Sequence, residues 1–338
     1  MTVPLTPELG DRLDAVASRP YRPPWWLRNH HLQTAWGPLL RRRAQLPFRL
    51  ERLETPDDDF LRTHWLEGDD DAPTVLILHG LEGSVASHNV VGFAAAVRET
   101  LGWSVVVMEH RSCGGELNRA RRMYHSGDTS DLELMVHELQ RRGVQDLYLF
   151  GISLGGNVLG KWLGEQSEQA PEWIRGAAVL SPPFDLLLSG PVIDRAAFGL
   201  YTKRFLRTLV PKALAKADQF PGSMDAKKVA ASKTFRDFDT WATAALHGFR
   251  DAEHYWDVVS CARVLDDVRV PLLLIAAEDD PFNPGTTHPH SSVASNPYLF
   301  ASFTRRGGHT GWVEGAPPAT RCWGEDQAVR FFEALAQG

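Results

Sequence analysis

A serine stands between two glycines at the end of an apolar stretch near the middle of the chain. The segment Gly151-Ile152-Ser153-Leu154-Gly155 has the form G-x-S-x-G, which can hold a serine hydroxyl on a sharp strand-to-helix turn. A serine hydroxyl is a weak nucleophile at neutral pH and needs a histidine base that a carboxylate orients. The pattern therefore predicts nucleophilic chemistry at Ser153, and its alternative is a glycine-rich turn in another kind of α/β protein.

Two neighbouring aspartates follow a later apolar stretch and are candidates for the carboxylate. Asp279 and Asp280 open the loop that continues as Pro281-Phe282-Asn283-Pro284. In an open α/β sheet, ligands bind beyond the carboxyl ends of the strands, so this loop is in a suitable place. We favour Asp280, which directly precedes Pro281. Asp279 competes with it, and its alternative role is to cap the next turn.

A histidine near the C-terminus is the candidate base. His309 lies in Gly307-Gly308-His309-Thr310-Gly311, where the glycines let the loop reach inward. His288 and His290 are rivals, but they follow Asp280 too closely for a helix and a strand to intervene, which favours a surface or loop-capping role. The order Ser153, Asp280, His309 is the one that α/β-hydrolases use.

Two backbone amides are candidates for stabilising the oxyanion that forms when a carbonyl is attacked. One is the N–H of Leu154, the residue after the predicted nucleophile. The other is the N–H of Leu81, since Gly80 before it allows the backbone to turn inward. Losing one such donor typically costs about 2.7–4 kcal/mol of transition-state stabilisation. His79, at the end of the preceding strand, is expected to be structural.

The predicted elements place these residues on one edge of a sheet. Apolar runs typical of buried strands alternate with segments of helical periodicity. This alternation predicts an α/β fold with a mostly parallel central sheet of about eight strands and helices on both faces. The predicted strands are 48–54, 60–66, 74–78, 104–108, 146–150, 176–180, 270–276 and 298–303. The predicted helices are 87–100, 128–142, 154–165 and 325–335.

One long segment between two predicted strands interrupts the alternation of strands and helices. A structureless loop over 187–269 is improbable, and apolar residues from Phe198 to Leu209 follow helical spacing until Pro211 interrupts them. We therefore divide the chain into a leader segment (1–45) that packs on the core, a core (46–186 and 270–338) and a helical cap inserted between its halves (187–269).

Composition narrows the class of protein further. The chain has 338 residues and a formal net charge of −6, which gives no global reason to bind nucleic acid. Three widely spaced cysteines and a first segment without an apolar stretch favour a cytoplasmic location. No nucleotide-binding glycine motif and no metal-ligand spacing is recognisable, so we expect neither a cofactor nor a metal.

The leader is basic and rich in tryptophan. Residues 1–50 carry eight arginines, three of them consecutive (Arg41, Arg42 and Arg43), against three acidic residues, and Trp25, Trp26 and Trp36 crowd the same region. The arginine run is interpreted as a solvated surface turn, and peripheral contact with anionic lipid is the alternative.

Several short motifs run through most of the chain. They are His31-Leu32-Gln33-Thr34, His79-Gly80-Leu81-Glu82-Gly83-Ser84, Arg111-Ser112-Cys113-Gly114-Gly115-Glu116-Leu117-Asn118, Tyr124-His125-Ser126-Gly127 and the three segments around Ser153, Asp280 and His309. Together these motifs resemble the YheT-like branch of the α/β-hydrolase superfamily. The resemblance implies carboxylic-ester hydrolysis by Ser153, Asp280 and His309. Ser112 replaces the glycine usual in the family, which puts the shape of that turn in doubt. The membrane anchor of eukaryotic members is not seen, so their membrane residence is not expected.

The sequence thus predicts a serine carboxylesterase for short- to medium-chain esters, with a small-molecule or lipid ester as its partner. Six aromatic residues of the cap are candidates for an apolar acyl pocket, or for plain core: Phe198, Tyr201, Phe205, Trp241, Phe249 and Trp256. An acyltransferase or a membrane-surface lipase with the same residues is the first alternative. A binding protein of this fold without turnover is the second, because fold alone does not prove activity.

Overall fold

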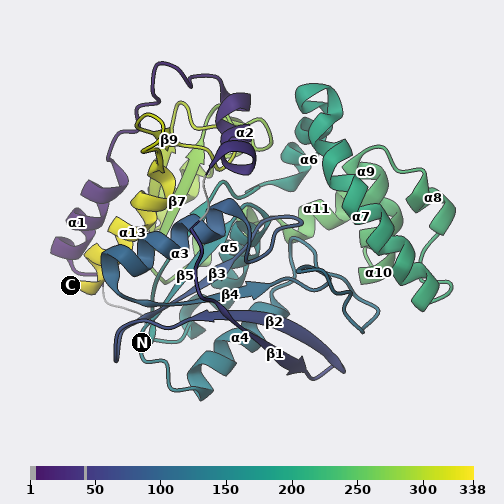
Figure 1. Cartoon of the computed structure of the whole chain (residues 1–338), viewed down its shortest axis with the longest axis horizontal. Coiled ribbons are helices and arrows are strands. Elements are labelled where there is room, and N and C mark those ends of the chain that lie inside the picture. The colour runs from purple at the N-terminus through teal and green to yellow at the C-terminus, as the bar shows by residue number, and fades with distance from the viewer. Residues whose placement is uncertain (1–4, 42–43) are drawn as a thin grey trace.

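The computed structural model describes residues 5–41 and 44–338 and is built around a single large sheet (Figure 1). Its eight strands lie in the order β1-β2-β4-β3-β5-β6-β7-β8. The pairs β1–β2 and β2–β4 are antiparallel, whereas every later pair is parallel. The mostly parallel sheet of about eight strands that the apolar runs predict is therefore confirmed.

The strands and helices begin and end close to the predicted positions. The strands are β1 (Arg49–Thr55), β2 (Asp59–Leu66), β3 (Thr74–Leu78), β4 (Ser104–Glu109), β5 (Leu147–Ile152), β6 (Ile174–Leu180), β7 (Leu272–Ala277) and β8 (Leu299–Thr304), with β9 (Val313–Glu314) and β10 (Arg321–Cys322) forming a separate small sheet. The helices outside the inserted segment are α1 (Pro7–Ala17), α2 (His30–Leu40), α3 (His88–Leu101), α4 (Ser130–Arg141), α5 (Leu154–Gln166), α12 (His290–Ser295) and α13 (Trp323–Ala336).

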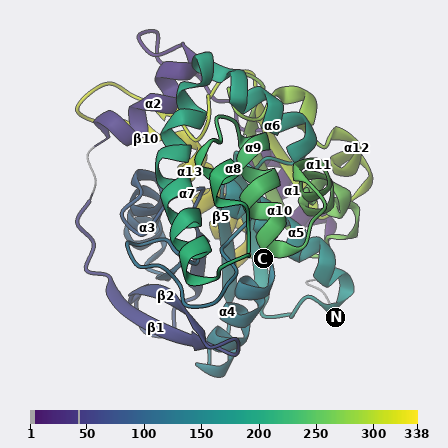
Figure 2. The ribbon, with the colours of Figure 1, turned by 90° about the vertical axis from the view of Figure 1, so that its right-hand side faces the viewer.

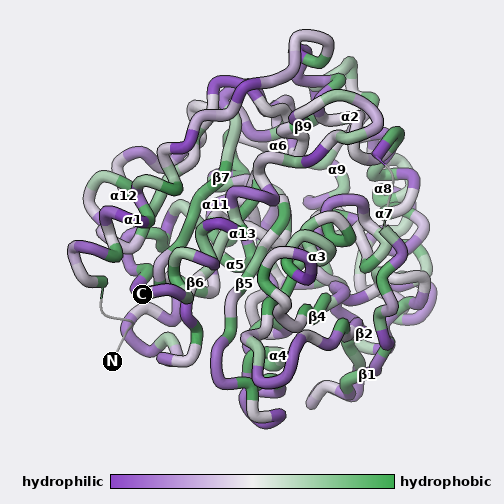
Figure 3. The backbone as a smooth tube through the Cα atoms, turned by 60° about the vertical axis from the view of Figure 1, so that its left-hand side comes forward, coloured by the Kyte–Doolittle hydropathy of each residue, from purple (hydrophilic) through white to green (hydrophobic). Residues whose placement is uncertain are grey.

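Alternate residues of each central strand belong to two different cores. In β3, Val75 and Ile77 pack with α1, α3 and α13 on one face, whereas Leu76 and Leu78 pack with α4 and α5 on the other. This follows from the period of two in a strand. Figure 3 shows hydrophobic colour along the strands in the middle of the molecule. The sheet is thus covered by helices on both faces, as predicted.

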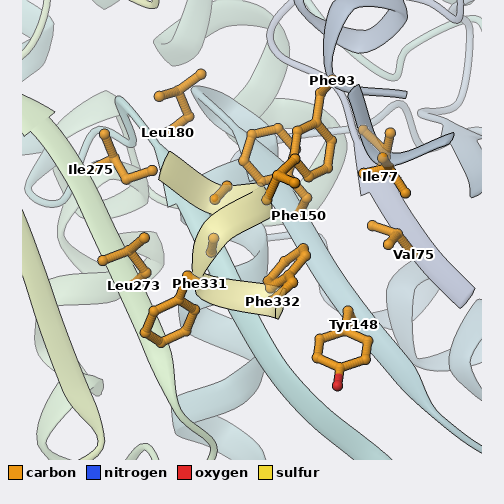
Figure 4. Close-up of a cluster of buried hydrophobic side chains, with 14 of the residues drawn as sticks. Val75, Ile77, Phe93, Tyr148, Phe150, Leu180, Leu273, Ile275, Phe331 and Phe332 are labelled. Atoms are coloured by element: carbon orange, nitrogen blue, oxygen red, sulfur yellow. The ribbon is translucent and has the colours of Figure 1, made fainter. Parts of the chain in front are cut away.

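Stacked aromatic rings fill the first of these cores (Figure 4). The ring centroid of Phe93 in α3 lies 3.7 Å from that of Phe150 in β5. The ring centroid of Phe332 in α13 lies 6.2 Å from that of Phe93 and 5.1 Å from that of Tyr148. Aromatic pairs of this kind add about 0.5–1.5 kcal/mol beyond the area that they bury. They fix the strand β5 that leads directly to Ser153.

The residues between β6 and β7 form helices that gather on one side of the sheet (Figures 1 and 2). They are α6 (Leu186–Arg195), α7 (Leu200–Gln219), α8 (Ala226–Ala230), α9 (Phe235–Phe238), α10 (Ala244–His247) and α11 (Ala252–Val259), with a turn of π-helix (Asp239–Thr243) before α10. Their buried side chains form a third hydrophobic cluster of their own. That they act as a cap, and the division of the chain into leader, core and cap, stay predictions.

Two expectations for this segment are wrong. Pro211 does not interrupt the helix but lies inside α7. Proline removes one backbone hydrogen bond, and the carbonyl that loses its partner belongs to Arg207, an exposed residue that water can reach. Phe198 is not part of the helix either: it precedes α7 with a left-handed backbone (φ 56°), and its side chain is fully exposed.

A buried guanidinium joins three parts of the fold. Arg111 donates to Asp59 at 2.6 Å, to Asp57 at 2.9 Å and to both carboxylate oxygens of Asp131 at 2.7 and 2.8 Å. These partners belong to the β1–β2 hairpin and to α4. Since the side chain of Arg111 is almost fully buried, its charge is compensated entirely by these carboxylates.

Candidate active site

Ser153 lies on a sharp turn between β5 and α5. Its backbone is left-handed (φ 52°, ψ −118°), and α5 begins at the next residue, Leu154. The turn requires glycine at position 155, because a Cβ there would lie 2.5 Å from the carbonyl oxygen of Leu78 and 2.6 Å from that of His79. The strand, the strained serine and the close-packed glycine together present the Ser153 hydroxyl at the carboxyl edge of the sheet.

The three predicted side chains meet in one hydrogen-bonded chain. The Nε2 atom of His309 lies 2.9 Å from Ser153 Oγ, and its Nδ1 atom lies 2.8 Å from Asp280 Oδ2. With a proton on Nδ1 donated to the carboxylate, Nε2 is free to accept the serine proton. Asp280 and His309 are both buried, in the loops after β7 and β8. The structure therefore brings together residues that are 156 positions apart in the chain.

The two aspartates of the β7 loop have different partners. The Oδ1 atom of Asp280 accepts from the backbone N–H groups of Phe282 and Asn283, which orients Oδ2 toward His309. Asp279 instead accepts from the N–H of Gly308 at 2.9 Å, and burial raises the pKa of its carboxyl. Asp280 thus contacts the imidazole, whereas Asp279 braces the loop that carries it.

The leader segment supports the His309 loop, which sequence reasoning missed. Thr34 Oγ1 of α2 accepts from the backbone N–H of His309 at 2.9 Å, and Gln33 Oε1 accepts from the N–H of Val313 at 2.9 Å. Both side chains are buried. The motif His31-Leu32-Gln33-Thr34 was the available signal, but its residue types alone do not say which distant loop they contact.

The loop after β3 is held by the neighbouring Tyr124 and by the inserted segment. Glu82 has a left-handed backbone (φ 55°) directly after Leu81. Its N–H donates to the hydroxyl of Tyr124, whose O–H donates to the Glu82 carboxylate, each at 2.9 Å. Lys212 of α7 donates to the same carboxylate at 2.8 Å. The residue next to Leu81 is therefore joined by an ion pair to a helix of the inserted segment.

Within the part of the chain that the structure describes, His79, His110 and His288 have other neighbours than Ser153. His79 Nε2 accepts from the N–H of His110, and His110 Nε2 lies 3.0 Å from the carbonyl of His79. Burial lowers the pKa of His79 to about 3 and that of His110 to about 4. His288 is buried against Phe303, so its expected surface position is wrong, whereas His290 is exposed.

A cavity of about 130 Å³ opens beside Ser153. Its wall is mostly apolar, and Leu81, Leu154 and His309 line it together with Ser153. The helices of the inserted segment supply most of the remaining wall, including Leu186, Ile193, Leu209, Phe235, Phe238, Leu246 and Trp256. Of the six aromatic residues suggested for an acyl pocket, only Trp256 is among the lining residues. The other five lie elsewhere: Phe198 and Phe249 stand outside the α-helices, and Tyr201, Phe205 and Trp241 are not part of the cavity wall.

One carboxylate lies in this apolar wall. Asp239, in the π-helical turn, accepts from Thr243 Oγ1 and from Trp256 Nε1, both at 2.7 Å. Burial raises its pKa to about 6, with the two hydrogen bonds acting in the opposite direction. Turns of π-helix occur frequently at functional sites. The mostly apolar wall of the cavity thus includes one buried carboxylate.

The turn in which Ser112 replaces the expected glycine keeps a left-handed conformation. The φ angle of Ser112 is 63°, a region that non-glycine residues adopt at a cost. Its hydroxyl donates to Asn118 Oδ1 at 2.5 Å and accepts from the Asn118 N–H at 3.3 Å. The serine therefore preserves the conformation by bonding across its own loop.

Comparisons with known proteins show the family to which this chain belongs. Residues 73–294 match the α/β hydrolase fold family. The candidate esterase YheT of Escherichia coli (strain K12) is 33% identical over 305 residues, which cover 88% of each chain. The chain belongs to the α/β-hydrolase family. It is a YheT-like member, as the motifs predicted.

More distant relatives of the chain extend the comparison. A phospholipase of Mus musculus, ABHD3, is 27% identical and covers 95% of this chain and 80% of its own length. A monoacylglycerol lipase of Saccharomyces cerevisiae is 29% identical over 82% of this chain and 62% of its own. A solved structure, the Pyrococcus furiosus esterase Pf2001, superimposes with a TM-score of 0.56 at 16% identity over 87% of this chain and 97% of its own. That likeness shows the fold alone.

Residues 5–41 and 44–338 show neither a cluster of metal ligands nor a membrane-spanning helix. Within these ranges, no group of three or more His, Cys, Asp or Glu side chains is placed to hold a metal ion. No helix in the same ranges combines the length and apolar character needed to cross a bilayer.

Proposed function

We propose that this chain is a serine carboxylesterase that hydrolyses short- to medium-chain esters through an acyl-enzyme intermediate. The observation that carries the proposal is the hydrogen-bonded chain from Asp280 through His309 to Ser153 at the mouth of an apolar cavity. This arrangement supplies a nucleophile, a base and a group that fixes the tautomer of the base. The names of the relatives, an esterase, a phospholipase and a lipase, agree with ester chemistry.

The reaction follows from the roles of these groups. Ser153 Oγ attacks the ester carbonyl while His309 Nε2 takes its proton, and the imidazolium is stabilised by Asp280. His309 then gives that proton to the leaving alcohol as the carbon–oxygen bond breaks. A water molecule, deprotonated by His309, attacks the acyl-enzyme, and the proton returns to Ser153 as the carboxylic acid leaves.

The oxyanion of each tetrahedral intermediate is assigned to the N–H groups of Leu81 and Leu154. Leu154 is the first residue of α5, so its N–H has no acceptor within the helix and lies at the positive end of the helix dipole. Leu81 lines the same cavity. Donors of this kind are effective because they are already oriented before the charge develops.

The size of the cavity supports a limited acyl length. A dry apolar cavity of about 150 Å³ in another protein accommodates benzene, and the cavity here measures about 130 Å³. Chains much longer than a medium acyl group must therefore extend out of it or displace the helices that line it.

Hydrolysis of p-nitrophenyl esters of increasing acyl length tests this function. We expect turnover to peak at short or medium acyl chains and to fall in Ser153→Ala by at least about a thousandfold. Ser189→Ala is the matched control, because Ser189 lines the same cavity and should keep most of the activity. Full activity in Ser153→Ala would contradict the proposal.

A second candidate function is acyl transfer or lipid hydrolysis at a membrane surface with the same residues. It is favoured by apolar side chains that are exposed on α2. Hydrolysis measured with and without an added alcohol separates the two outcomes, since a transferase would form the new ester in place of the acid. A binding protein without turnover, the remaining alternative, would show neither product.

We also propose a cytoplasmic location for the chain. The three cysteines are free and buried, as a reducing compartment permits.

A further inference from the structure

Helix α2 shows an inverted pattern of burial. Its buried residues are Gln33, Thr34 and Gly37, whereas Leu32, Leu39 and Leu40 are 55%, 69% and 64% exposed. A helix at the surface of a globular protein normally buries its apolar residues and exposes its polar ones. The inner face of α2 is polar because it bonds the His309 loop, but this requirement does not explain why the outer face is apolar.

A second group of exposed apolar side chains lies beside α2. Phe198 is fully exposed, with left-handed backbone at both Ala197 and Phe198, and Leu200 is 64% exposed. His31 of α2 lies 3.0 Å from the hydroxyl of Tyr201, which joins the two groups. Figures 1 and 2 both place α2 near the start of the inserted helices. We call the exposed residues of both groups the mouth surface: Leu32, Leu39, Leu40, Phe198 and Leu200.

The mouth surface adjoins the active site. The ring of Tyr201 lies 4.7 Å from that of Phe282, which in turn lies 4.3 Å from the His309 imidazole. Exposed apolar side chains gathered in one place mark interaction sites. A partner on this surface would therefore meet the protein where substrate must enter.

The charge around the mouth surface indicates the partner. Residues 15–50 and 195–217, the two segments that carry the surface, contain no Asp or Glu. Their exposed basic side chains include Arg22, Arg28, Arg195, Lys203, Arg204 and Arg207. A second copy of the chain would bring the same positive charge, which opposes self-association. Apolar side chains among basic ones match the acyl boundary and headgroups of an anionic lipid surface.

We propose that the mouth surface docks this protein onto anionic membranes, with α2 and the start of α7 inserted at the headgroup level. The proposal rests on the function proposed above, since it places the Ser153 cavity against a source of lipid esters. Arg41 is not part of the contact: it pairs with Glu325 at 2.5 and 2.7 Å, so its expected place in a solvated turn is wrong. Arg42 and Arg43 lie outside the described residues.

Vesicle co-sedimentation of the intact chain tests the docking separately from catalysis. Phosphatidylcholine vesicles with and without phosphatidylglycerol are compared, and the Ser153→Ala variant is used so that no product accumulates. We expect binding only to the anionic vesicles, weakening as salt is added. The double variant Leu39→Ser/Phe198→Ser should bind at least about tenfold more weakly, and Arg204→Gln/Arg207→Gln about fivefold more weakly for each charge removed.

Controls decide between docking and a general loss of structure. Leu50→Ser and Val258→Ser remove side chains that are about half exposed but lie outside the mouth surface, and they should leave vesicle binding unchanged. Hydrolysis of a water-soluble ester by Leu39→Ser/Phe198→Ser on the active background should equal that of the unaltered chain. Absence of binding to anionic vesicles, equal binding by all variants, or a dimer that Phe198→Ser dissociates would overturn the docking proposal. Vesicle binding by an unaltered chain that hydrolyses no soluble ester would instead contradict the proposed function.

Discussion

At the scale of single residues, two adjacent aspartates illustrate what a sequence leaves open. Asp279 and Asp280 have the same side chain and neighbouring positions, so spacing alone only favours one of them. The structure separates them by partner: Asp280 contacts His309, and Asp279 contacts the N–H of Gly308. Which carboxylate faces the imidazole depends on the path of the loop, and that path is set by contacts with the distant β8 loop.

The two aspartates should respond differently to the same substitution. In Asp280→Asn, the amide no longer fixes the His309 tautomer, so kcat should fall by about a thousandfold to ten-thousandfold. In Asp279→Asn, the loop keeps an acceptor for Gly308, and we expect a loss of less than about tenfold. Steady-state kinetics with one p-nitrophenyl ester measures both. The reverse order of the two losses would assign the carboxylate to Asp279.

The buried Asp239 predicts a pH effect on stability. Its pKa is raised from 3.8 to about 6 in the folded chain, so the folded state binds more protons between these pH values and wild-type stability falls as pH rises through them. Asparagine does not titrate. From pH 4 to pH 7.5, the free energy of unfolding of the wild type should therefore fall by about 2–3 kcal/mol relative to that of Asp239→Asn.

Urea unfolding of both proteins at the two pH values measures this shift. Asp237→Asn is a matched control of opposite sign, because backbone and side-chain hydrogen bonds lower the pKa of Asp237. Its carboxylate stabilises the fold above the unfolded pKa and loses that effect as pH falls. If the free energies of unfolding of the wild type and Asp239→Asn differ by the same amount at both pH values, burial does not raise the pKa of the Asp239 carboxyl.

At the scale of elements, the strands were predictable and the helix α2 was not. Each central strand is an apolar run because both of its faces are covered, and such runs are visible in a sequence. The inner face of α2 carries polar residues that bond the His309 loop. The spacing of its apolar residues therefore does not predict which face of the helix is buried. The prediction that Pro211 ends the helix was wrong for a different reason: proline removes only one backbone hydrogen bond, and the carbonyl that loses it belongs to the exposed Arg207.

The contact between Lys212 and Glu82 predicts a link between the inserted segment and the loop of Leu81. Lys212 is a positioning residue in this account, acting through Glu82. Lys212→Met should lower kcat by about tenfold and leave KM nearly unchanged, because a misplaced Leu81 N–H weakens interactions that form only in the transition state.

Rescue and comparison variants make this test specific. Lys212→Arg keeps the charge near Glu82 and should recover most of kcat. Lys203→Met changes an exposed lysine of the same helix and should have no effect on a water-soluble ester. Equal losses in Lys203→Met and Lys212→Met, or a rise in KM alone, would show that the ion pair does not position the loop.

At the scale of the whole molecule, the predicted layers were confirmed because they rest on hydrophobic patterning, whereas the polar connections between elements were invisible. Arg111 stands in a motif that the resemblance identified, yet nothing in its spacing shows that it bonds Asp57, Asp59 and Asp131. Polar networks of this kind join segments that are far apart in the chain, and only the packed fold brings their charges together.

Removing the charge of Arg111 should destabilise the whole fold. Arg111→Met leaves the buried carboxylate of Asp59 without its cation and Asp131 with Arg122 alone, and breaking a buried ion pair in this way typically costs about 3–5 kcal/mol. Arg141→Met removes an exposed partner of Glu138 and should cost less than about 1 kcal/mol. Denaturant unfolding at neutral pH compares them, and equal midpoints would refute the structural role of the Arg111 network.

The proposed chemistry depends most on Ser153 being the activated nucleophile. The most direct measurement is peptide mapping by mass spectrometry after reaction with a fluorophosphonate, which bonds covalently to a serine oxygen with loss of fluoride. We predict one adduct per chain, on the peptide that contains Ser153, absent in Ser153→Ala and formed at least about a hundredfold more slowly in His309→Ala. An adduct on another serine, or an active protein that forms none, would contradict the account.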